Sequence, residues 1–111
     1  MTTTQTLSSL VNDINSAQTI EENVYKLAEY LVINYNQRGY NSELNVEVTK
    51  GRKYFKVLTD SSVNCFVDVK NGDVYKAASY NKPAKHVRYN LLQDPQDCYN
   101  KCDWSGGYLY L

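Results

Sequence analysis

The chain has 111 residues, a formal net charge of zero, 42% hydrophobic residues and 22% charged residues, proportions typical of one soluble globular domain. A neutral chain has no overall attraction for nucleic acid or for an acidic membrane surface, so any such contact requires a local concentration of charge. No apolar run approaches the roughly 18 residues that a membrane helix requires, so we expect no membrane partner.

We expect residues 1–111 to form a single domain, with residues 1–5 as a polar, threonine-rich, disordered tail. The N-terminus lacks the basic and hydrophobic regions of a secretory signal. Three cysteines is an odd number for a disulfide framework. Both observations predict a cytoplasmic protein. Pairing of Cys98 with Cys102 stays open, although a reducing compartment favours free thiols.

The spacing of apolar residues predicts two helices in the first forty residues. Thr19 and Glu22 match a capping box and predict that a long helix starts at Thr19. Gly39 predicts its end, so this helix covers residues 19–38. A short helix precedes it at Leu7, Leu10, Val11 and Ile14, and the long helix has one apolar face made of Val24, Leu27, Ala28, Leu31, Val32 and Tyr35.

From Leu44 onward the apolar residues alternate with polar ones, which indicates strands. Four short strands separated by turns predict an α+β fold, an antiparallel meander packed against the long N-terminal helix. Pro83 predicts a short helix over residues 83–91 after the sheet, with Ala84, Val87 and Leu91 facing inward. Residues 93–107 are expected to be irregular, and residues 108–111 to form a last strand.

Asn71-Gly72 is a strong hairpin signal between the third and fourth strands, and it predicts a positive φ at Gly72. The register of this hairpin is open. A two-residue turn pairs Lys70 with Asp73, whereas a turn with a glycine bulge pairs Val69 with Asp73. We favour the bulge, because it puts Val67 and Tyr75 on one face and keeps Lys76 out of the core.

The segment from Val74 to Leu92 contains four basic residues, the only histidine and no acidic residue. Such a concentration predicts a surface that meets an anion, either a phosphate-bearing ligand or an acidic protein surface. Lysines at the N-terminus of the expected 83–91 helix would favour a phosphate there, and nearby tyrosines would stack on a base. The candidate ligand-binding residues are Tyr75, Lys76, Tyr80, Lys82, Lys85, His86, Arg88 and Tyr89.

Catalytic and metal chemistry have weaker signals. His86 is the only histidine, and no spacing identifies a nucleophile among Cys65, Ser79, Cys98 and Cys102 that would partner it. A zinc site would require Cys65, His86, Cys98 and Cys102 together, with no Cys-x-x-Cys pair. We therefore predict a protein that is not an enzyme, with no catalytic residues, no metal and no cofactor.

The segment FVDVKNGDVYKAASYNKPAKHVRYNL resembles one found in small accessory proteins of tailed bacteriophages. The likeness lies in Phe66-Val67-Asp68, in residues 72–76, in Pro83-Ala84-Lys85, in Arg88 and in Asn90, and it covers about a quarter of the chain. It implies a viral accessory protein, acting in the host cytoplasm, and brings no activity with it.

Together these observations predict a non-enzymatic viral protein that binds nucleic acid or a nucleotide through a basic, tyrosine-containing surface. One alternative is a protein-interaction or virion-associated module, and a weaker one is a small hydrolase that uses His86. A homodimer is compatible with each hypothesis.

Overall fold

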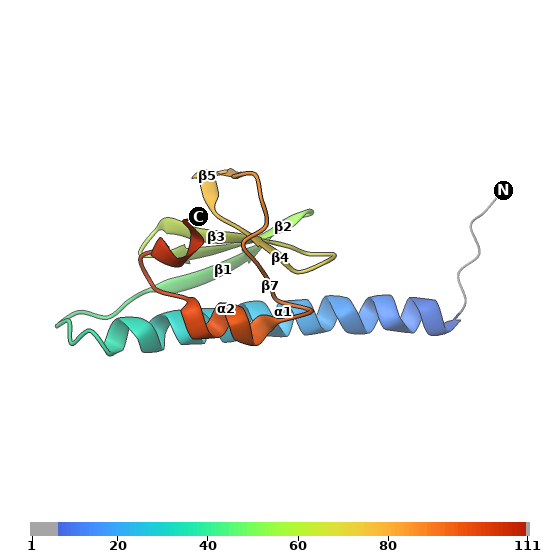
Figure 1. The fold of residues 1–111 in the computed structure, drawn as a ribbon, viewed down its shortest axis with the longest axis horizontal. Coiled ribbons are helices and arrows are strands. Elements are labelled where there is room, and N and C mark those ends of the chain that lie inside the picture. Colours follow the sequence, from blue (N-terminus) through green and yellow to red (C-terminus); the bar gives the residue numbers. More distant parts are fainter. Residues whose placement is uncertain (1–6, 111) are drawn as a thin grey trace.

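The structure of the chain is a computed structural model that describes residues 7–110, with side chains from Asp13 onward. The predicted tail at residues 1–5 lies outside the described residues. One long helix runs beneath an antiparallel sheet, and a small hairpin lies on the side of the sheet away from that helix (Figure 1). The predicted α+β architecture is confirmed.

Helix α1 extends from Leu7 to Asn36 without interruption. The prediction of a helix start at Thr19 was therefore wrong. No glycine or proline separates Ile14 from Thr19, so nothing in the sequence ends the first helix, and a capping residue acts only where the preceding backbone is not helical. The C-terminal end agrees with the prediction, because the turn after Asn36 closes at Gly39, which has φ of +75°.

The main sheet has five antiparallel strands in the order β1-β2-β3-β4-β7. The four meander strands were predicted, and β7 was not. One face of the sheet packs on α1 to form a core that includes Ile20, Leu27, Phe55, Val57, Cys65, Val67 and Val74. The strands are β1 (Val46–Lys50), β2 (Tyr54–Thr59), β3 (Ser62–Asp68), β4 (Asp73–Tyr75) and β7 (Tyr89–Asn90).

The β3–β4 hairpin has neither of the two registers considered above. Val67 pairs with Val74 and Phe66 with Tyr75, so the loop is longer than a two-residue turn. Gly72 has φ of +81°, as predicted, and its N–H donates to the Asp68 carbonyl. This register places both valines in the core, and it turns Tyr75 to the opposite face from Val67.

Residues 83–91 do not form the predicted helix. Strand β5 (Ala77–Ser79) pairs with β6 (Lys82–Pro83), and the segment after β6 then crosses back to β7. The N–H groups of Ala84 and Arg88 donate to the carbonyls of Lys76 and Val74, which fixes the segment to the preceding strand region. Val87, expected to face inward, is 47% exposed, whereas Leu91 is fully buried.

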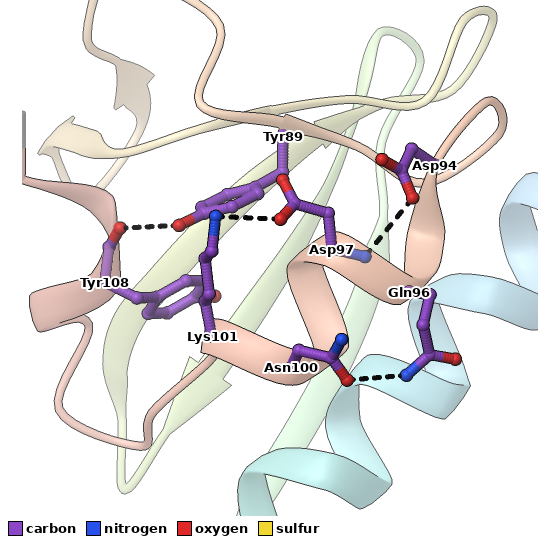
Figure 2. A network of polar contacts seen from close by, with 7 residues as sticks. All are labelled: Tyr89, Asp94, Gln96, Asp97, Asn100, Lys101 and Tyr108. Carbon is purple, nitrogen blue, oxygen red and sulfur yellow. Dashed lines mark hydrogen bonds and ion pairs between the residues drawn. The ribbon is translucent and has the colours of Figure 1, made fainter.

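Helix α2 (Pro95–Lys101) lies where an irregular segment was predicted (Figure 2). The side chain of Asp94 accepts a hydrogen bond from the N–H of Asp97, and proline occupies the first turn. Asp97 and Lys101 form an ion pair of 2.9 Å. Tyr99 anchors α2 on α1, because its hydroxyl donates to the Asn23 carbonyl at 3.0 Å.

The C-terminal segment folds around Asp103 instead of forming a strand. A 3-10 helix covers Gly107–Leu109, so the predicted strand at 108–110 was wrong, and residue 111 lies outside the described part of the chain. The Asp103 carboxylate accepts hydrogen bonds from the backbone N–H groups of Ser105, Gly107 and Tyr108. The buried amide of Asn64 donates to the carbonyls of Asp103 and Trp104, which ties this turn to β3.

Stability should depend on pH through Asp103. Partial burial alone would raise the pKa of this carboxyl, but hydrogen bonds from Ser105, Gly107 and Tyr108 outweigh burial and lower it. The carboxylate therefore stabilises the fold above the unfolded pKa of about 3.9, and this contribution is lost as the pH falls through the lower folded pKa. The melting temperature of the wild type should fall over this range more steeply than that of Asp103→Asn. Parallel pH profiles would contradict the assignment.

Candidate ligand-binding face of the sheet

Some residues of the basic segment predicted from the sequence are exposed in the structure, and others form contacts within the protein. Lys82 is exposed on β6, and Lys85 and His86 are exposed in the loop that follows. His86 has φ of +73° in this loop. Because the expected helix at 83–91 is absent, its N-terminus offers no phosphate site, and only the charges themselves remain as attraction for an anion.

Arg88 and Lys76 have contacts within the protein. The Arg88 Nε donates to the Leu109 carbonyl at 2.9 Å, and its Nη1 donates to the carbonyls of Lys85 and His86. The Lys76 Nζ lies 4.6 Å from the centroid of the Tyr110 ring. Arg88 thus joins the loop after β6 to the C-terminal turn, a structural role that sequence analysis did not predict.

The three candidate tyrosines do not form one stacking surface. Tyr75 lies on the sheet face opposite the core, and Tyr80 lies at the tip of the β5–β6 hairpin with 57% of its surface exposed. Tyr89 packs against the core, where its hydroxyl donates to the Tyr108 carbonyl at 3.2 Å (Figure 2). Burial first, with neighbouring charges, raises the pKa of Tyr89.

The sheet face opposite α1 carries aromatic rings in mutual contact. Tyr54, Phe66 and Tyr75 share this face by strand register. The Tyr54 ring meets Phe66 and Tyr75 edge-on, at centroid distances of 5.8 and 6.1 Å. We call this surface the outer face; Phe66 is buried beneath it, and its accessible residues are Lys53, Tyr54, Lys56, Tyr75 and Tyr80.

Lysines flank these rings. The Lys56 Nζ lies 3.9 Å from the centroid of the Tyr80 ring and 5.8 Å from that of Phe66. It also donates to the Asn81 side chain at 3.0 Å, which fastens the hairpin tip to β2. At the other end, the Lys53 Nζ lies 5.4 Å from the Tyr54 ring. Cations and aromatic faces therefore alternate along the outer face.

Acidic residues border one end of the outer face. Tyr75 has a raised pKa, caused first by burial and then by the negative charge of Asp73, with a further contribution from Asp68. Beside this end is a hollow of about 280 Å³ that is lined by three basic side chains. Its lining residues are Arg52, Lys53, Asp68, Val69 and Lys70. At the other end, the basic residues are Lys56, which lies over the Tyr80 ring, and Lys82 on β6 of the same hairpin.

Sequence analysis missed Lys53, Tyr54, Lys56 and Phe66. Phe66 lies opposite Lys56 only because β2 and β3 pair in this register, and Tyr80 reaches Lys56 only because the hairpin folds back over the sheet. The available signal was the alternation in β2, where Lys56 stands between the buried Phe55 and Val57 and must point to the other face.

The three cysteines are free and buried, and they belong to the core. Burial is the main cause that raises the pKa of Cys65 to about 12 and that of Cys102 to about 11, and it also raises the pKa of Cys98. Thiols with such values are protonated at neutral pH and are poor nucleophiles. His86 is exposed in its loop, so the structure does not place it in the core with these thiols.

Within residues 7–110, no group of three or more His, Cys, Asp or Glu side chains is arranged to hold a metal ion. None of the helices in the described part of the chain has the length and apolar character needed to cross a membrane.

Comparison with known proteins places the chain in a family without assigning an activity. No curated protein and no solved structure matches it. A family model described as a family of unknown function, DUF7717, matches residues 3–111. Since this match covers nearly the whole sequence, the chain belongs to the DUF7717 family of unknown function.

Proposed function

We propose that the outer face binds a phosphate-bearing ligand, a single-stranded nucleic acid or a nucleotide. The observation that carries this proposal is the contact between Lys56 and the exposed ring of Tyr80. The Lys56 Nζ lies 3.9 Å from the centroid of that ring. A base can stack on the tyrosine while the ammonium group lies near the adjoining phosphate. The proposal keeps Tyr75, Tyr80, Lys82, Lys85 and His86 as candidate contacts and adds Lys53 and Lys56.

An open face favours a strand over a small ligand in a closed pocket. The half-buried rings of Tyr54 and Tyr75 lie next to each other on the same face, so more than one base has a ring to meet. Antiparallel sheets with aromatic residues on an exposed face bind single strands in this manner. The buried free thiols fit a reducing compartment, and the likeness to tailed-phage proteins fits a viral accessory role in the host cytoplasm.

Binding should be measured by fluorescence anisotropy with a labelled single-stranded oligonucleotide at about 50 mM salt. We expect log affinity to fall linearly with log salt, with a slope near −2 if about three phosphates are neutralised. Tyr80→Ala should weaken binding by about 1–3 kcal/mol, or roughly 5- to 150-fold, because it removes one stacking ring. The matched control is Tyr25→Ala, which removes a similarly exposed tyrosine from α1.

The lysine contribution should be tested with Lys82→Ser combined with Lys85→Ser, which should weaken binding and flatten the salt slope. Arg88 is left unchanged, because its hydrogen bonds to Leu109 and to the loop carbonyls hold the fold. Lys26→Ser on α1 is the control. A wild type that binds neither oligonucleotide nor nucleotide at about 50 mM salt would refute the proposal.

A second candidate is a protein-interaction module, as the sequence also allowed. Its support is an aromatic cluster at the C-terminal end of α1, where the Tyr40 ring lies 4.8 Å from Tyr35 and 5.8 Å from Trp104. Tyr40 is 51% exposed, and tyrosine and tryptophan are frequent at the centres of protein interfaces. Tight oligonucleotide binding without salt dependence would favour nonionic contacts and weaken the phosphate hypothesis in favour of this one.

A further inference from the structure

The hollow of about 280 Å³ at one end of the outer face is built from two turns of the sheet. Arg52 and Lys53 line it from the turn between β1 and β2, and Asp68, Val69 and Lys70 line it from the end of β3 and the turn that follows. The N–H of Val69 donates to the Lys53 carbonyl at 3.0 Å. The lining residues therefore belong to one hydrogen-bonded end of the sheet.

Within residues 7–110, no ion pair involves the three basic side chains of this hollow. The side chains of Arg52 and Lys70 are exposed, and neither is hydrogen-bonded to another described residue. Positive groups gathered around one hollow repel one another, and a bound anion would replace this repulsion with attraction. The hollow is therefore a candidate anion site whose charges are not already used by the fold.

Asp68 is the one acidic residue that lines the hollow, and backbone groups use its carboxylate. Its Oδ1 accepts hydrogen bonds from the N–H groups of Lys70 at 2.8 Å and of Asn71 at 3.2 Å. Three positive groups and one negative group leave the lining with a formal charge of +2. A phosphate monoester, with a charge of about −1.5 to −2 at pH 7, matches this value better than the singly charged phosphodiester inside a strand.

Lys53 connects the hollow to the outer face. This residue lines the hollow, and its Nζ lies 5.4 Å from the centroid of the half-buried Tyr54 ring. The Tyr54 ring in turn meets the Tyr75 ring at 6.1 Å. Pockets for whole ligands usually have volumes of about 300 Å³ or more, so the hollow suits a phosphate group whose base remains outside, on these rings.

We propose that the hollow binds the terminal phosphate monoester of a single strand, while the adjoining base stacks on Tyr54. The planar guanidinium of Arg52 can donate two hydrogen bonds to one phosphate, and Lys53 and Lys70 supply ammonium donors. This inference rests on the proposed function and deepens it, because it names the phosphate of the strand that the protein recognises.

The test compares three oligonucleotides of one sequence with the same internal fluorescent label. One has a 5′-phosphate, one has a 3′-phosphate, and one has no terminal phosphate. Their binding to the full chain is measured by fluorescence anisotropy at about 50 mM salt. At least one phosphorylated oligonucleotide should bind about tenfold more tightly than the unphosphorylated one, which is the effect of one charge-assisted hydrogen bond.

Arg52→Ser combined with Lys70→Ser should abolish this preference and keep binding of the unphosphorylated oligonucleotide, because the outer face, with Lys53, is unchanged. Since both replaced side chains are exposed, the circular dichroism spectrum should stay that of the wild type. The matched control is Lys26→Ser combined with Arg38→Ser, which removes the same two charges from exposed positions in α1 and in the turn after it. This control should keep the preference.

A wild type that binds the three oligonucleotides with equal affinity overturns this inference and leaves the proposed function intact. A preference that survives Arg52→Ser with Lys70→Ser, or that the control variant loses equally, also overturns it. A wild type that binds none of the three refutes the proposed function and this inference together.

Discussion

Replacing Gly72 with alanine should lower the free energy of unfolding by about 2–5 kcal/mol, through two separate costs. The first is the left-handed backbone, with φ of +81°, which a residue with a Cβ adopts only under strain. The second is contact, because a Cβ at this position would lie 2.9 Å from the backbone nitrogen of Leu92 and 3.2 Å from its Cβ. Gly72→Val should cost more still.

Gly39→Ala separates these two costs. Gly39 has nearly the same backbone, with φ of +75°, but a Cβ there would meet nothing within 4 Å. Its replacement should cost only the backbone strain, about 1–2 kcal/mol. The comparison requires urea melts of both variants and the wild type. Equal losses of stability would mean that crowding of the added Cβ at position 72 against Leu92 contributes nothing.

The position of Gly72 also explains why the hairpin register could not be predicted from the turn. Asn71-Gly72 correctly indicated a turn with a positive φ, but turn chemistry alone allowed several pairings. The observed register brings Val67 opposite Val74, and the Leu91 N–H donates to the Gly72 carbonyl at 2.8 Å. The valine pair is set by burial against α1, and the second contact joins the turn to a segment far along the sequence, so turn chemistry alone did not reveal them.

The helix boundaries show a different limit. The apolar spacing of Val24, Leu27 and Leu31 predicted the core face of α1 correctly, because that face meets a single surface. The capping-box match at Thr19 and Glu22 suggested a second helix start, whereas α1 is one continuous helix. Helix α2 was missed despite a local signal, the Asp94-Pro95 start followed by Asp97.

The candidate binding face was predicted only in part. Tyr75 and Tyr80 were among the residues chosen from the basic segment, and they lie at the two ends of the outer face. Lys56 and Phe66 come from neighbouring strands, and their contact exists only after the sheet has formed. Arg88 was chosen for its charge, but its hydrogen bonds to backbone carbonyls depend on the path of the C-terminal turn.

Leu27→Ala and Leu31→Ala should each destabilise the protein by about 2–5 kcal/mol, the range for a fully buried leucine truncated to alanine. Both side chains are completely buried in the core between α1 and the sheet. The cost should include the lost transfer of the methyl groups and the cavity left behind, because the sheet above is held by its own hydrogen bonds and cannot collapse fully into the space.

Ile33→Ala is the control for this prediction, because Ile33 lies on the same helix with 49% of its surface exposed. Its replacement should change stability by no more than about 0.5 kcal/mol, since little apolar surface is returned to water. If both leucine variants also cost less than about 0.5 kcal/mol in urea melts, α1 is not packed on the sheet in solution. The outer face would then lack its support, because the core packed beneath β2 and β3 lies between these strands and α1.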